Sequence, residues 1–117
     1  MGSMRRVLPA LAVLLLAGCG SDDKPAAPSE PQSGTANVGM NRLKFEPEDI
    51  TVTTGTKVVW TDNENVPHNV VANEGADFKS EVFGQGKTYE WTAEQAGTVK
   101  YECTLHPGMD GTITVVD

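Results

Sequence analysis

Residues 35–117 are dominated by β-branched side chains. Among these 83 residues, 12 are Thr, 11 are Val and two are Ile, whereas leucine occurs only at Leu43 and Leu105. β-branched side chains restrict the χ1 angle and suit a pleated sheet better than a helix. The composition therefore argues against a helical bundle and predicts an all-β fold.

Short runs of alternating apolar and polar residues recur along this part of the chain, and glycine or proline punctuates them. The predicted strands are residues 38–45, 50–53, 57–61, 69–72, 88–92, 98–103 and 112–116. Seven to eight short strands at this spacing are typical of a Greek-key β-sandwich or barrel. We assign this fold to a domain at residues 38–117.

The alternation within the strands predicts which side chains face inward. Val99, Tyr101 and Cys103 share one face of the sixth predicted strand, so Cys103 ends a strand while pointing toward the core. Trp60 and Trp91 are interpreted as core side chains, because buried aromatics dominate small cores.

The first 18 residues are predicted to be a lipoprotein signal peptide. Arg5 and Arg6 precede an apolar run at residues 7–17, whose 11 residues are fewer than the ~20 that a membrane-spanning helix needs. The end of the run resembles the lipobox of bacterial lipoproteins and reads Leu16-Ala17-Gly18-Cys19. Cleavage and lipidation at Cys19 would anchor the chain to the outer face of a cytoplasmic membrane or in an envelope. An ordinary secretory signal is the alternative.

Residues 19–37 are predicted to be a flexible tether that begins at the lipidated Cys19. After that cysteine the segment is rich in Pro, Ala and Ser and has no apolar side chain larger than Ala. Such a composition cannot bury a core and extends the chain instead. The tether would hold the folded domain away from the membrane.

The charge and the cysteine count exclude two classes of protein. Nine Lys and Arg stand against 16 Asp and Glu, a net charge of -7. An acidic surface repels phosphate backbones, so no nucleic acid is expected as a partner. Two cysteines, Cys19 and Cys103, are too few for a disulfide-dense scaffold.

The segment between the last two predicted strands carries the chemistry. It contains Cys103, His106 and Met109 in a C-x-x-H-x-x-M arrangement, and the only other histidine is His68, where a loop enters the fourth predicted strand. One thiolate, two imidazoles and a weak axial thioether are the ligand set of a blue-copper site. The thiolate and thioether favour Cu(I), and the imidazoles serve both oxidation states. These four residues are therefore predicted to hold one copper ion.

The same residues allow other interpretations. A catalytic Cys103–His106 pair would need an accessible nucleophile and an orienting group, and neither is evident in the sequence. A structural zinc site prefers four Cys or His ligands and gains little from Met109. A disulfide between Cys19 and Cys103 would require Cys19 to stay unlipidated. Individually, each side chain could also be ordinary core or loop.

The chain resembles the plastocyanin, pseudoazurin and amicyanin branch of the cupredoxins over residues 38–116. The segments that carry the resemblance are Phe45-Glu46-Pro47, Ile50-Thr51-Val52, Gly55, Val58-Val59-Trp60, Pro67-His68-Asn69-Val70-Val71 and residues 97–115. The two-residue gaps in the ligand loop resemble the short amicyanin-type loop.

The resemblance implies a role for each residue of the site. His68, Cys103 and His106 would be equatorial copper ligands and Met109 the axial one. Asn69 would brace the loop that holds the cysteine, as outer-sphere groups commonly orient ligands. Many relatives have proline where this chain has Leu105, which leaves the redox potential and the protonation of the neighbouring histidine open.

The function implied is that of a one-electron carrier and not that of an enzyme. The carrier would work as a monomer between redox partner proteins outside the cytoplasm. By analogy, the second histidine ligand would reach the surface in an apolar docking patch formed by Pro67, Leu105 and Pro107, with Met40 as a further candidate. Copper delivery to another copper protein is the alternative function. Catalysis as in copper nitrite reductases or multicopper oxidases is disfavoured, because one copper uses both histidines.

Overall fold

Eight strands and no helix make up the regular structure that a computed structural model describes for residues 30–117. The strands are β1 (Thr35–Asn41), β2 (Lys44–Glu46), β3 (Asp49–Thr53), β4 (Lys57–Asp62), β5 (Val71–Glu74), β6 (Thr88–Thr92), β7 (Gly97–Glu102) and β8 (Asp110–Val116). The predicted signal peptide, the lipidation site Cys19 and the first part of the predicted tether lie outside the described residues. Within residues 30–117 no helix is long and apolar enough to cross a membrane.

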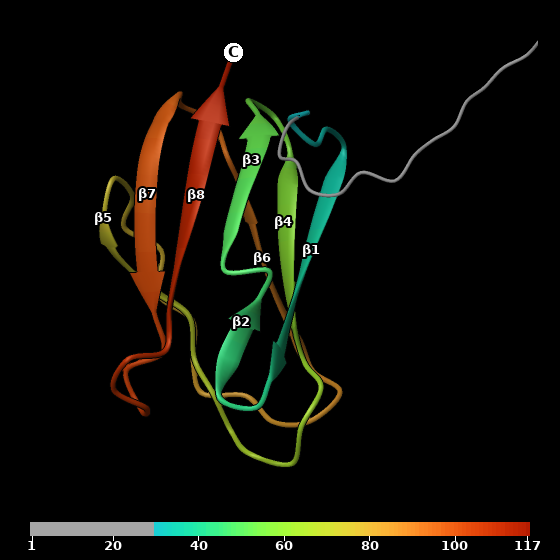
Figure 1. Cartoon of the computed structure of the whole chain (residues 1–117), viewed down its shortest axis with the longest axis vertical. Coiled ribbons are helices and arrows are strands. Elements are labelled where there is room, and N and C mark those ends of the chain that lie inside the picture. Colours follow the sequence, from blue (N-terminus) through green and yellow to red (C-terminus); the bar gives the residue numbers. More distant parts are fainter. Residues whose placement is uncertain (1–29) are drawn as a thin grey trace, which may run out of the picture.

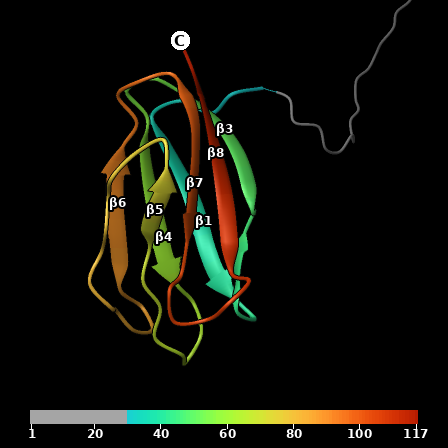
Figure 2. The ribbon, with the colours of Figure 1, turned by 90° about the vertical axis from the view of Figure 1, so that its left-hand side faces the viewer.

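The strands form two four-stranded sheets that pack as two layers (Figures 1 and 2). One sheet has the order β2-β1-β4-β6 and the other β3-β8-β7-β5. Strands β1 and β4 are parallel, as are β3 and β8, and the other neighbours are antiparallel. The predicted all-β sandwich is confirmed.

The first predicted strand, residues 38–45, is wrong in one respect, because the chain reverses within it. Strands β1 and β2 form a hairpin in which Asn41 pairs with Lys44. The two residues of its tip, Arg42 and Leu43, have φ angles of 53° and 58°. Two-residue hairpins favour such angles, but usually with Asn or Gly at these positions. The sequence lacks that signature, so the turn was not predicted.

The core lies between the sheets and is built from alternate residues of their strands. Trp60 and Tyr101, from opposite sheets, are almost completely buried and meet edge to face, with ring centroids 5.3 Å apart. Trp91 is only half-buried and packs against Phe78 at the side of this core. Cys103 directly follows β7 and is buried, as the alternation predicts.

Three connections meet at the end of the sandwich opposite the C terminus (Figure 1). They are the β1–β2 hairpin tip, the segment that leads from β4 toward β5, and the β7–β8 loop. Figure 2 shows the same arrangement from the side. The residues predicted to bind copper lie on the last two of these connections, so the sandwich brings them to one pole.

Stability should fall at alkaline pH because of Tyr101. Burial raises the pKa of this phenol far above its ordinary value of 10. The unfolded chain therefore ionises first, so the contribution is complete below about pH 10 and is lost as the pH rises toward the folded pKa. We expect urea unfolding to show about 1 kcal/mol more loss between pH 8 and pH 11 in the wild type than in Tyr101→Phe. Equal losses in the two proteins would contradict this account.

Candidate metal centre

The β7–β8 loop is a tight turn that directs three candidate ligands to one point. The Cys103 amide donates to the Met109 carbonyl at 2.9 Å, and the Met109 amide donates to the His106 carbonyl at 3.1 Å. Because both ends of the loop are held by the antiparallel strands β7 and β8, these bonds fix the three side chains relative to the sheet. Cys103 and Met109 are almost completely buried, and His106 is half-buried.

The fourth residue, His68, reaches the same point from the segment between β4 and β5. Its backbone exchanges two hydrogen bonds with Phe83, at 3.0 and 2.8 Å. These bonds hold the histidine in place although it lies outside a regular strand. Its side chain is completely buried.

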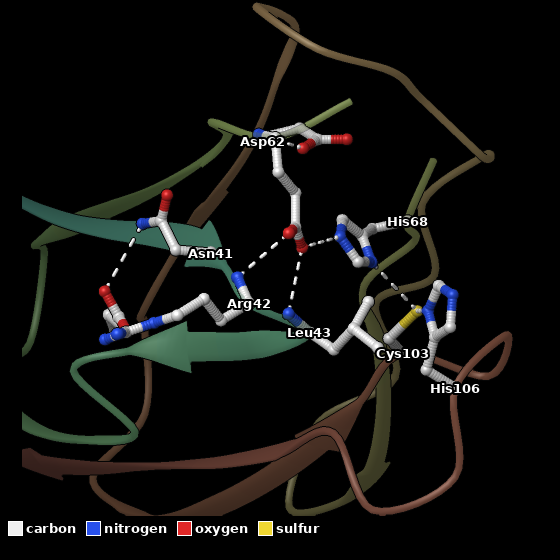
Figure 3. A network of polar contacts seen from close by, with 9 residues as sticks. Asn41, Arg42, Leu43, Asp62, His68, Cys103 and His106 are labelled. Carbon is white, nitrogen blue, oxygen red and sulfur yellow. Dashed lines mark hydrogen bonds and ion pairs between the residues drawn. The ribbon is translucent and has the colours of Figure 1, made fainter. Parts of the chain in front are cut away.

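The side chains of His68 and His106 both point toward the sulfur atom of Cys103 (Figure 3). The Sγ atom lies 3.7 Å from Nδ1 of His68 and 3.5 Å from Nδ1 of His106. The candidate ligand atoms of the three residues all lie within 4.8 Å of one another. Among the described residues this is the only group of three or more His, Cys, Asp or Glu side chains that could hold a metal ion.

The donor set fits copper. A soft thiolate and two imidazoles suit both Cu(I) and Cu(II), and Met109, buried in the same loop, would add a thioether to these three ligands. When bound, copper supplies a centre that gains and loses one electron. The buried position of Cys103, with 2% of its surface exposed, does not suit a nucleophile that must reach a substrate.

Glu64 is a functional residue that the sequence interpretation missed. Its Oε2 lies 2.7 Å from Nε2 of His68, whose Nδ1 faces the sulfur. A carboxylate that accepts a hydrogen bond from the Nε2–H group fixes the tautomer of the imidazole. The Nδ1 lone pair is then free to bind a metal. The spacing of four residues before the histidine is the only signal in the sequence, and outside a helix that spacing does not imply contact.

The electrostatics of Glu64 keep it in the form that accepts hydrogen bonds. Burial by itself raises the pKa of this carboxyl. Hydrogen bonds from the Leu43 amide, from His68 and from the Arg42 amide lower the pKa by more than burial raises it. The net result is a pKa below the ordinary value of 4.5. Glu64 is therefore a carboxylate at neutral pH and acts as a pure acceptor.

Asn69 connects the segment of His68 with the ligand loop. Its side-chain amide donates to Oγ1 of Thr104 at 2.9 Å, and the Thr104 amide donates to its side-chain oxygen at 2.8 Å. Thr104 directly follows Cys103. The paired bonds therefore join the residue after one ligand to the residue after another, which is the geometry that a bracing role requires.

The three residues predicted to form a docking patch are exposed. Pro67 precedes the buried His68, Leu105 and Pro107 flank the half-buried His106, and Leu105 has 44% of its surface exposed. Met40, the further candidate for this patch, is completely buried, so that suggestion is wrong. It lies on an inward-facing position of β1, where the alternation with Val38 places it in the core.

Comparison with known proteins agrees with this geometry. A family described as copper binding proteins, plastocyanin/azurin family, matches residues 32–116. Amicyanin of Paracoccus denitrificans is 34% identical over 98 residues, which cover 80% of this chain and 74% of the relative. Plastocyanin A/B of Petroselinum crispum is 36% identical over 85 residues, which cover 62% of this chain and 88% of the relative.

Solved structures give the same picture. A purple cupredoxin from Nitrosopumilus maritimus superposes with a TM-score of 0.65 at 28% identity, covering 68% of this chain and 98% of that one. An oxidised amicyanin variant superposes with a TM-score of 0.66 at 34% identity, covering 70% of this chain and 82% of that one. With its ligand set and two-layer fold, the chain belongs to the plastocyanin/azurin family of copper-binding proteins.

Proposed function

We propose that this protein carries single electrons between redox partner proteins outside the cytoplasm, and that it is not an enzyme. The observation that carries this proposal is the burial of the ligand set. His68, Cys103 and Met109 each have 2% or less of their surface exposed, and a hydrogen-bonded frame holds them. A rigid site that suits both oxidation states needs little rearrangement when an electron arrives or leaves.

Copper delivery is the competing function, and it makes a different demand on the site. A carrier of metal must release it readily, whereas an electron carrier retains copper in both states. We expect voltammetry of the copper-loaded protein to show a reversible one-electron wave, and a Cu(I) chelator to remove the metal slowly. Rapid and complete transfer of Cu(I) to the chelator, without a reversible wave, would favour delivery and overturn our proposal.

The lipid anchor at Cys19 is part of this proposal. It is supported by the lipobox-like motif and by the Pro-rich segment that separates it from β1. Two or more acyl chains give stable anchoring, whereas one gives only reversible binding. Labelled fatty acid should enter the wild-type protein but not Cys19→Ser, and equal labelling of the two would refute the anchor.

The apolar surface around His106 is proposed as the docking patch for the redox partner. We define this patch by Pro67, Leu105 and Pro107 and add Leu43, which is 44% exposed at the tip of the β1–β2 hairpin, at the same pole. Apolar groups at the centre of a transient interface exclude water and bring the half-buried imidazole close to the partner. The expected partner therefore presents an apolar face.

Leu105→Asp should slow electron exchange. Each encounter of two copies would bring two carboxylates into an apolar contact, and unpaired charges in such a contact are costly. We expect electron self-exchange between the Cu(I) and Cu(II) proteins to slow by about tenfold or more, as measured by NMR line broadening. Val82→Asp is the matched control, because Val82 is 54% exposed and lies outside the patch. Equal slowing by both variants would indicate a general charge effect and no patch.

A further inference from the structure

One carboxylate connects the docking patch with a copper ligand. Oε1 of Glu64 accepts the Arg42 amide at 2.9 Å, and Oε2 accepts the Leu43 amide at 3.0 Å. Oε2 also lies 2.7 Å from Nε2 of His68. Figure 3 shows Arg42 and Leu43 of the hairpin tip near His68, and its dashed lines mark these contacts. Both oxygens are used, and the side chain is 19% exposed.

The hairpin tip adopts a conformation that its own residues do not favour. Arg42 and Leu43 both have positive φ angles, which side chains with a Cβ atom rarely adopt. Such a backbone persists where its surroundings determine it. Here the two amides of the tip donate to the same carboxylate, so Glu64 holds the tip in place.

The far end of this connection is also fixed. The Glu64 amide donates to Oδ1 of Asp62 at 3.0 Å, and Asp62 is completely buried at the end of β4. The backbone of Glu64 is therefore anchored to the sheet, while its carboxylate reaches outward to the tip. Movement of the tip must act on the carboxylate rather than shift the whole segment.

We propose that Glu64 is a positioning residue that couples the Arg42–Leu43 hairpin tip to His68, so that a partner touching Leu43 alters the copper site through this carboxylate. The inference rests on the proposed function, because it requires a partner on the docking patch. A shorter bond from His68 to Glu64 makes the imidazole a stronger donor and favours Cu(II), whereas a longer bond favours Cu(I).

This coupling must be reciprocal. If contact at Leu43 changes the relative stability of Cu(I) and Cu(II), then the oxidation state changes the affinity for the partner by the same factor. A partner that lengthens the bond would bind the Cu(I) protein more tightly. The carboxylate would thus let the docking patch distinguish the two oxidation states.

Amide hydrogen exchange tests the connection without a partner and in metal-free protein. Glu64→Gln offers one acceptor oxygen where the carboxylate offers two, so the Arg42 and Leu43 amides should exchange about tenfold faster or more. The matched control is Glu46→Gln. Glu46 contacts the side chains of Asn41 and Arg42 in the same hairpin but not the tip amides. Exchange unchanged by Glu64→Gln, or accelerated equally by both variants, would overturn the proposal.

Voltammetry of a double-mutant cycle tests whether the tip acts on the copper. The turn variant Arg42→Asn/Leu43→Gly places residues that favour positive φ at the tip. We expect it to shift the reduction potential of the wild type but not of Glu64→Gln. Identical shifts in both backgrounds would overturn the coupling. If the wild type gives a reversible wave but the two shifts are identical, only this inference is refuted. If the wild type gives no reversible wave, the proposed function is refuted.

Discussion

Replacing Cys103 by serine abolishes the intense blue absorption that we expect of the protein loaded with Cu(II). The band arises from charge transfer between the thiolate and the metal, and the described residues contain no other cysteine. Cys103 lies within 3.7 Å of the inward nitrogen of each histidine, so its sulfur is a common neighbour of both. Serine keeps the size but offers a hard, protonated oxygen that suits copper poorly.

The measurement is a visible titration with Cu(II), read at one equivalent. Cys19→Ser is the matched control, because it removes the other cysteine of the chain and should leave the band unchanged. A pale absorption that is the same in the wild type and in Cys103→Ser would show that the ligands do not bind one copper together. The assignment of the metal centre would then fail.

Gly75→Ala should destabilise the protein by about 3 kcal/mol. The new methyl group has no room, and the backbone at this position has a positive φ angle that alanine disfavours. Gly75 directly follows β5 and has a φ of +84°. An added Cβ would overlap the Thr98 carbonyl oxygen and lie 3.0 Å from the Thr98 carbonyl carbon and from Cα of Val99. These are backbone atoms of the central strand β7 and cannot move aside. This loss is a large part of the free energy of unfolding, which is about 5–15 kcal/mol for typical domains.

Two other glycines separate the causes of this loss. Gly86 has a φ of +83° but nothing near its Cβ position, so Gly86→Ala should cost only about 1 kcal/mol. Gly84 has neither a positive φ nor a neighbour within 4 Å, so Gly84→Ala should be nearly neutral. Urea unfolding of the three metal-free variants gives the comparison. A cost at Gly75 no larger than at Gly86 would show that the contact with β7 is not tight.

The strands and the convergence of the ligands could be predicted from the sequence because both leave local signals. Alternation with a period of two marks the buried faces of β4 and β7, and it places Cys103 inward at the end of its strand. The spacing of His106 and Met109 within one loop ensures that they lie near the cysteine. His68 could be assigned because the chain has no other histidine outside the loop.

The rest depends on contacts between distant segments. Met40 and Phe45 both face the core although they are five positions apart, so the alternation changes phase at the hairpin, and neither tip residue is the Asn or Gly that would mark the turn. Glu64 meets the tip across 21 and 22 residues of sequence, and no local pattern records such a contact. Gly75 likewise owes its importance to a strand that follows much later in the chain. These features follow from the packing of the sandwich.

The parallel pairing of β3 with β8 has a consequence for the order in which the molecule assembles. Asp49 pairs with Thr112, so a long stretch of chain must close before β3 joins its sheet, and folding that depends on such distant pairs is slow. Cys103, His106 and Met109 are close together in the sequence, whereas His68 joins them only when β5 pairs with β7, where Val71 lies opposite Glu102. Copper can therefore bind weakly to a newly made chain. It stabilises the native state only to the extent that its affinity for the completed site is higher than its affinity for the unfolded chain.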